Sequence, residues 1–348
     1  KKLWGLPSYV LMILIVILTS LFYPKISNEF NMLIIYKDST VVAENAKKIS
    51  EVNGGSVPVF VEISVDDVTS LAAMNQVNSL SNALSSSDSV DHVMNPYAFF
   101  NIISNMTMHS DISSDIVLGI IYQNALAENP DMITSMMNEE ENKVKLIVFP
   151  KDLNNATLDN IDQVVLSEHA DAITAGPQYI LKDLNDKIFT MQLSSIVLAI
   201  TAVFVMLLIS LRSIKIAAIS VVPIVISVLA IYAFLGMTGI PLNITTVMIF
   251  SITIGVGIDY AVHYSSVYRL FLKEGHSKHE SVEIAYSYAS RPIIANALGV
   301  AIGETILMLS PLQIHFNVSV LMWVGMITSV LMTLSVLPTI LKIEKKNS

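Results

Sequence analysis

The sequence predicts an α-helical membrane bundle of six transmembrane helices, with an α+β domain inserted between the first two. Three observations lead to this fold class. Only 14% of the 348 residues are charged while 53% are hydrophobic, and soluble domains average about 25% charged residues. Long apolar segments recur along the chain. Acidic residues gather in one stretch, residues 25–187, which is long enough for a domain of its own.

Each apolar segment approaches the roughly 20 residues that a helix needs to cross a bilayer. The charge-free stretch 216–258 is too long for one span, and the Gly and Pro residues of 236–243 divide it. The first apolar run is too long for a signal peptide, so we expect a retained anchor. The sequence begins without Met, and we expect a longer chain upstream. The predicted spans are 5–24, 190–211, 215–236, 243–266, 292–310 and 318–341.

Lys and Arg residues indicate the orientation of these spans. They cluster before the first span, around 212–215, within 269–291 and after residue 341. The positive-inside rule places these segments in the cytoplasm. We therefore expect both termini to be cytoplasmic and residues 25–187 to be extracytoplasmic. The predicted organisation is one helix at 1–24, the domain at 25–187, five helices at 188–342 and a tail at 343–348.

The inserted domain alternates short β-rich segments with helical patterns, which is typical of an α+β sandwich with helices on one face of a small sheet. We expect residues 178–189 to continue as helix into the second span. Strands are predicted at 32–36, 57–63, 89–94, 143–150 and 171–177. Helices are predicted at 41–52, 69–86, 95–109, 114–138 and 156–169.

An acidic residue, Asp259, interrupts the fourth span. Ser251, Gly255, Asp259 and His263 are spaced by four and share one helix face. Arg269 marks the cytoplasmic end ten residues later, so Asp259 lies about 15 Å deep. A low-dielectric medium favours the neutral form of a carboxyl group, and intramembrane acids commonly belong to proton relays.

The hydroxyl group of Tyr260, beside Asp259, is a candidate relay or stabiliser of the proton. The alternative for Asp259 is a hydrogen-bonded acid that only holds helices together. His263, one turn nearer the cytoplasm, is a candidate for the relay or the substrate path, although an ordinary interfacial residue is the favoured interpretation. Tyr260 alone would be a packed aromatic residue.

A second acidic residue, Glu304, interrupts the fifth span. Asn296 lies two turns away on nearly the same face, so both residues are candidates for a relay or a substrate path. A Glu304 side chain that reaches toward the outer interface is the competing interpretation. The small residues near these acids favour close helix packing. They are Gly255, Gly257, Gly299 and Gly303, with Ser251.

Several functional classes are disfavoured by the composition. The chain has no cysteine, which removes disulfides and thiolate metal sites. No basic stripe is available to neutralise nucleic-acid phosphates. His276 and His279 lie in a segment that is predicted to be a solvated loop rather than a metal site. No nucleophile–base pair indicates an enzyme, and we expect neither a metal nor a cofactor.

Segment 255–269, GVGIDYAVHYSSVYR, resembles the fourth-helix signature of the resistance–nodulation–division superfamily, especially its MMPL-like exporters of lipids and hydrophobes. Residues 291–341 resemble that family's fifth and sixth helices, and 175–186 the end of its porter domain. The resemblance implies a transporter in the cytoplasmic (inner) membrane of a prokaryote. It implies a proton gradient as the energy source, with Asp259 and Tyr260 as the relay pair. Membrane lipids or amphiphiles are the implied substrates.

Two departures from the family pattern affect these expectations. Family members carry two such repeats, and this chain has one, which resembles the C-terminal half. The second repeat is therefore expected in a longer chain, a second copy or another protein. Glu304 stands where an apolar residue is expected. The alternative functions are a lipid- or sterol-sensing protein that does not pump, and a translocation accessory like the SecD/SecF pair.

Overall fold

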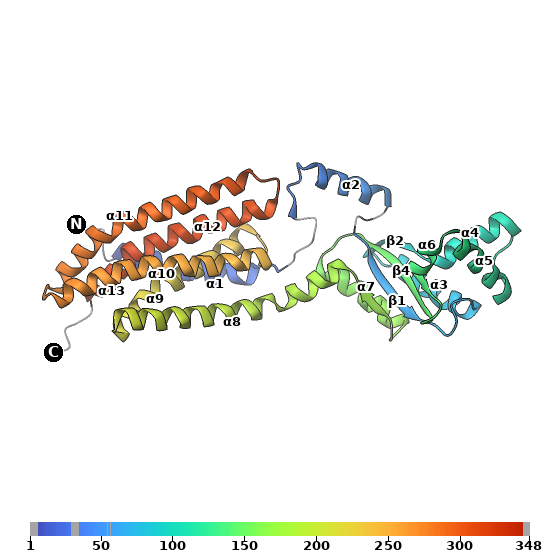
Figure 1. Ribbon diagram of the computed structural model, residues 1–348, viewed down its shortest axis with the longest axis horizontal. Coiled ribbons are helices and arrows are strands. Elements are labelled where there is room, and N and C mark those ends of the chain that lie inside the picture. Colours follow the sequence, from blue (N-terminus) through green and yellow to red (C-terminus); the bar gives the residue numbers. More distant parts are fainter. Residues whose placement is uncertain (1–5, 29–34, 54, 56, 344–348) are drawn as a thin grey trace. The chain divides into compact units, whose positions relative to one another are not determined.

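The computed structural model describes residues 6–28, 35–53, 55 and 57–343. The chain divides into two compact units (Figure 1). The helical unit comprises Lys1–Glu29, Ile34–Tyr36 and Asn185–Ser348. The sheet unit comprises Phe30–Leu33 and Lys37–Leu184.

Long apolar helices make up the helical unit. Within the described residues, six helical segments are long and apolar enough to cross a membrane, which confirms the six predicted spans. The last span changes to a π-helical turn at Met332–Val336 and resumes as α13, Leu337–Ile343. The other helices are α1 (Leu6–Phe22), α8 (Pro177–Leu211), α9 (Ile214–Thr238), α10 (Ile244–Lys273), α11 (Lys278–Thr305) and α12 (Gln313–Leu331).

Local sequence signals set the ends of these helices. Gly239 ends α9 in the left-handed region, with φ of 72°, a conformation that glycine adopts without steric cost. Asn243 then begins α10, and its side chain forms a capping box with Thr246. Ser277 forms the equivalent capping box with Glu280 at the start of α11. The predicted division at 236–243 is therefore confirmed.

Helix α10 lies among α9, α11 and α12, while α1 packs against α9 (Figure 1). Small residues allow two of these close approaches. A side chain at Gly236 would overlap the backbone carbonyl of Phe22. A Cβ atom at Gly325 would lie 2.5 Å from Thr253 Oγ1. Close approach through small residues is typical of helix packing in membranes.

The sheet unit contains an antiparallel sheet in the order β2-β4-β1-β5, with β3 also paired to β4. Val61 in β1 pairs with Leu146 in β4 and with Thr174 in β5. Units β1-α3-β2 and β4-α7-β5 interleave as in a split βαβ motif. The strands are β1 (Val59–Ser64), β2 (Val90–Met94), β3 (Met137–Asn138), β4 (Lys143–Pro150) and β5 (Ile173–Ala175).

The buried face of this sheet carries Val59, Val61 and Ile63 from β1, and helices pack against it. From α3 and α7, Leu80 and Ile161 are fully buried in the same core. The helices are α2 (Val41–Asn53), α3 (Leu71–Ser85), α4 (Pro96–Met108), α5 (Asp115–Glu128), α6 (Pro130–Met136) and α7 (Asn155–Glu168).

One predicted helix of the sheet unit is wrong. The expected helix at 114–138 is divided into α5 and α6, followed by the short strand β3. Pro130 has no backbone N–H, and its ring disfavours the helical conformation at the preceding residue. Asn129 accordingly has φ of −140° and ψ of 68°. Most of the strand predicted at 32–36 lies outside the described residues, while Tyr36 forms an isolated bridge with Leu312.

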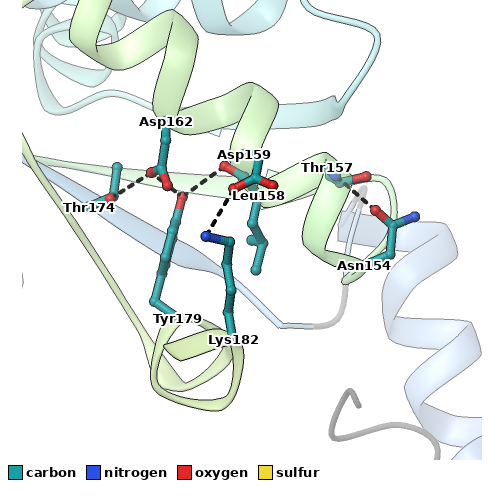
Figure 2. Close-up of polar contacts among 8 residues, drawn as sticks. All are labelled: Asn154, Thr157, Leu158, Asp159, Asp162, Thr174, Tyr179 and Lys182. Atoms are coloured by element: carbon teal, nitrogen blue, oxygen red, sulfur yellow. Dashed lines mark hydrogen bonds and ion pairs between the residues drawn. The ribbon is translucent and has the colours of Figure 1, made fainter. Parts of the chain in front are cut away.

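The first turns of α8 are fixed to α7 within the sheet unit (Figure 2). Tyr179 Oη donates to Asp162 Oδ1 over 2.8 Å, and Thr174 Oγ1 donates to the same oxygen over 2.7 Å. Lys182 Nζ lies 2.9 Å from Asp159 Oδ1. Helix α8 then runs without interruption to Leu211, so the predicted helical continuation through 178–189 is confirmed.

Candidate functional site

Asp259 lies near the middle of α10 on an exposed face of that helix. Ser251, Gly255 and His263, at intervals of four residues, are exposed on the same face. Among the described contacts, no hydrogen bond or ion pair involves the side chain of Asp259 or His263. We call these four residues the α10 stripe.

Tyr260 points away from this stripe, although it follows Asp259 directly. Successive residues are about 100° apart around a helix, and Tyr260 is only 1% exposed. Its hydroxyl group donates to Met326 Sδ on α12 over 3.6 Å, which is a weak bond to a soft acceptor. The structure therefore does not bring the phenol and the carboxyl group together on one face.

Helix α11 contributes a second exposed face that carries small and polar residues. Asn296, Gly299 and Gly303 are exposed, and Glu304 is half-exposed one residue before the end of α11. The backbone carbonyl of Glu304 accepts a hydrogen bond from Ser319 Oγ over 2.5 Å. Helices α10 and α11 pack against each other in the bundle, and each also has exposed small and polar residues.

The glycines near Asp259 differ in their surroundings. A Cβ atom at Gly257 would lie 3.3 Å from Ile224 and 3.5 Å from Ser329 Oγ, so Gly257 faces the bundle core. By contrast, a Cβ atom at Gly255, Gly299 or Gly303 would meet no atom within 4 Å in the described chain. These three positions therefore have no close neighbour among the described residues.

Some polar contacts in the core could not be predicted from the sequence pattern. Ser220 on α9 and Ser265 on α10 are buried and lie 2.6 Å apart. Ser329 Oγ donates to Ser227 Oγ over 3.0 Å and joins α12 to α9. Met326 is another such residue, because nothing in its sequence context marks it as a partner of Tyr260. Interhelical bonds of this kind add about 0.6 kcal/mol on average.

The ionisable side chains near the middle of α10 are those of Asp259 and His263. Within the described ranges, no group of three or more His, Cys, Asp or Glu residues could hold a metal ion. Arg269, which donates from Nη2 to the Arg212 carbonyl over 3.1 Å, is ten residues from Asp259, about 15 Å along the helix. Near the middle of α10, the carboxyl group of Asp259 therefore has the imidazole of His263 one turn away.

Six apolar helices, one with an acidic residue at its centre, and a small antiparallel sheet define a multi-pass membrane protein with an ionisable intramembrane group. The family model described as "MMPL family" matches residues 32–344. The chain belongs to the MMPL family, whose members are membrane transporters of hydrophobic substances rather than enzymes.

Two curated relatives are similar over shorter segments. Membrane protein MJ1562 of Methanocaldococcus jannaschii is 26% identical over 113 residues, which cover 32% of this chain and 29% of the relative. Membrane protein ActII-3 of Streptomyces coelicolor is 29% identical over 106 residues, which cover 30% of this chain and 15% of the relative. The aligned segments thus span less than a third of either relative.

Proposed function

We propose that this chain is one half of a proton-driven exporter of lipids or other amphiphiles, in which Asp259 binds and releases the proton. The observation that carries the proposal is the place of this carboxyl group, exposed at the middle of a membrane-spanning helix. Membership of a family of hydrophobe transporters supports the substrate class. The gradient is the energy source, and the mechanism needs no cofactor.

The cost of exposing Asp259 to lipid argues for a second six-helix unit. A charged side chain at the bilayer centre costs about 2.5–3.5 kcal/mol on insertion scales. Such residues face a bundle interior or a water-filled path. The open space along Gly255, Gly299 and Gly303 fits a helix of that second unit. The second six-helix unit belongs to a longer chain, a second copy of this chain or another protein.

Protonation of Asp259 changes which environment the α10 stripe prefers. The neutral carboxyl group tolerates an apolar surface, whereas the carboxylate requires water or a cation. One charge crossing 100 mV releases about 2.3 kcal/mol, and 1.4 kcal/mol corresponds to a factor of ten. One proton per cycle therefore supports a concentration ratio of about forty for the cargo.

Other side chains have supporting roles in this proposal. His263 is one turn from Asp259 toward Arg269 and extends the path to that end of the helix. Asn296 and Glu304 line the route on α11. Tyr260 positions α10 against α12 through Met326. In this proposal the sheet unit is extracytoplasmic and handles the cargo, and the cell is a prokaryote. Both termini are in the cytoplasm, an orientation that the Lys and Arg clusters support.

The test is Asp259→Asn, which keeps the shape of the side chain and removes its titration. We measure efflux of a fluorescent fatty-acid analogue from cells that express the full chain with its native neighbours. Proton flux is followed by a pH-sensitive dye in membrane vesicles. We expect both to fall to the level of cells that lack the protein.

Asp171→Asn is the matched control, because Asp171 lies in an exposed turn of the sheet unit. It should transport like the wild type, and immunoblots should show equal amounts of both variants in the membrane. Wild-type transport by Asp259→Asn would refute the proposal. Ligand binding without any gradient-driven flux in the wild type would indicate a lipid sensor instead.

A further inference from the structure

An apolar crevice lies between α11 and α12, on a different side of α11 from Ala295, Gly299 and Gly303. Its volume is about 140 Å³. Ala295, Gly299 and Gly303 lie about 150° around α11 from the crevice lining, at 100° per residue. The lining residues are Ile294, Ala297, Leu298, Ala301, Trp323, Met326, Ile327, Val330 and Leu331.

The chemistry of the lining selects a hydrocarbon. The nine side chains offer no charged group, and both helices are membrane spans. An apolar cavity of about 150 Å³ in another protein stays dry and binds benzene. An empty crevice of this size would also forfeit the dispersion contacts of its walls. Water is therefore a poor occupant and an alkyl chain a good one.

The surroundings indicate where the alkyl chain comes from. Leu298 and Ile327 are about half exposed and join the crevice to the apolar outer surface of the helices. In a bilayer that surface contacts lipid tails. The nearest source of hydrocarbon is thus a chain of a membrane lipid, which reaches the crevice without leaving the hydrocarbon layer.

One wall residue connects the crevice to the candidate site. Met326 lines the crevice, and its sulfur accepts the hydrogen bond of Tyr260. Methionine has three rotatable bonds and adapts to its neighbours, so an occupant that pushes on Met326 changes the position of this acceptor. Tyr260 is adjacent in sequence to Asp259 on the same helix.

We propose that this crevice binds one acyl chain of a bilayer phospholipid, and that Met326 transmits its occupancy to Tyr260. The second statement rests on the proposed function, whereas the first does not. The site is thereby a regulatory lipid site on the opposite side of α11 from the small-residue face.

The chain provides its own reporter for the binding test. Its two tryptophans are Trp4 and Trp323, and Trp4→Phe leaves only the crevice residue. Its indole is oriented by a 3.0 Å hydrogen bond from Nε1 to Thr305 Oγ1. The full chain is reconstituted in phosphatidylcholine vesicles with a rising fraction of phosphatidylcholine brominated at mid-chain, which quenches tryptophan fluorescence on contact.

Ile327→Phe, in the Trp4→Phe background, enlarges a lining side chain, and Ile302→Phe makes the same change at an exposed position of α11 outside the lining. We expect half-maximal quenching to need a severalfold higher brominated fraction in Ile327→Phe than in the other two proteins. Leu331→Phe is a second filling variant if Ile327→Phe does not fold. Two outcomes would overturn the binding site. One is the same brominated fraction at half-maximal quenching in all three proteins. The other is no quenching of Trp323 in the Trp4→Phe protein, because another protein covers it.

Met326→Leu tests the link to Tyr260, because leucine keeps a similar volume without the sulfur acceptor. We expect unchanged quenching by brominated lipid and a severalfold loss of proton flux and efflux. Unchanged flux would refute the link and leave the binding result in place. If the wild type carries no proton flux, the proposed function fails, and the quenching experiment still decides the lipid site.

Discussion

At the scale of single residues, Asp162 shows how one carboxylate organises the base of a helix. Its Oδ1 atom accepts from both Tyr179 and Thr174 (Figure 2). Burial and the hydrogen bond to Asp162 raise the pKa of Tyr179 above its ordinary value of 10. The phenol therefore stays protonated in the folded protein at pH values where the unfolded chain loses this proton.

Tyr179→Phe tests this contact. We expect it to lower the local stability of α7 and the first turns of α8 by about 1 kcal/mol, the usual net value of a hydrogen bond. Because the pKa of Tyr179 is raised on folding, the contact stabilises the folded protein fully at pH values below the pKa of the unfolded chain, near 10. This stabilisation is lost as the pH rises above that value. The difference between wild type and variant should thus shrink above about pH 10.

Hydrogen exchange of the full chain measures this change. Tyr288→Phe, at an exposed position of α11, is the control and should leave the exchange of α7 unaltered. Identical protection of α7 in wild type and Tyr179→Phe would show that the contact adds no stability.

At the scale of elements, the rotation of α10 about its own axis decides which residues serve the site. Phe250, Ile254 and Ala261 fix one face in the core. Asp259 is thereby turned outward, and Tyr260 inward to Met326. The packing of α10 against its neighbours therefore sets both the exposure of Asp259 and the contact of Tyr260 with Met326.

Gly236→Ala tests the packing of α1 on α9. The added methyl group meets the backbone carbonyl of Phe22, which cannot rotate away as a side chain would. Overpacking of this kind costs about 1–3 kcal/mol, more than the roughly 1 kcal/mol that Ala gains over Gly as a helix former. We expect a lower midpoint of thermal unfolding for the purified protein in lipid.

Gly299→Ala is the matched control for this experiment, since its methyl group meets no described atom within 4 Å. Its unfolding midpoint should equal or exceed that of the wild type. Equal midpoints for Gly236→Ala and the wild type would contradict the close approach of α1 and α9.

At the scale of the whole molecule, our proposal requires a second unit beside the helical unit. Its core buries apolar residues from α9, α10 and α12, yet a carboxyl group and an imidazole remain exposed on a span. Lipid satisfies the apolar outer positions, such as Leu198 and Ile209 on α8, and does not satisfy Asp259. We therefore propose that the assembly that functions in the membrane contains more protein than the described helices.

Gly299→Trp should block that assembly, because a large side chain fills the space that we assign to a helix of the second unit. Leu198→Trp, at a position of α8 that is 71% exposed, is the control. For a second unit that is a second copy or another protein, native mass spectrometry from lipid nanodiscs should show the wild type and the control in complex with that unit, and Gly299→Trp without it. A wild type that is monomeric and still pumps would rule this interface out.

The amino-acid sequence determined the features that depend on short stretches of chain. A run of about 20 apolar residues crosses a bilayer whatever its neighbours are, so the six spans and the division at 236–243 could be predicted. Capping side chains next to the first turn begin several helices, α10 and α11 among them. Even the broken helix at 114–138 carried its signal, because Pro130 disfavours helix at Asn129.

Only the tertiary structure decided which way each helix faces. Apolar residues occur on every side of α10, so periodicity does not select the buried side, and contacts with residues far away in the sequence select it instead. Those contacts turn Tyr260 toward Met326 and Asp259 outward, separate Gly257 from the other glycines and open the crevice between α11 and α12. These features arise from the packing of several helices at once, and no single segment encodes them.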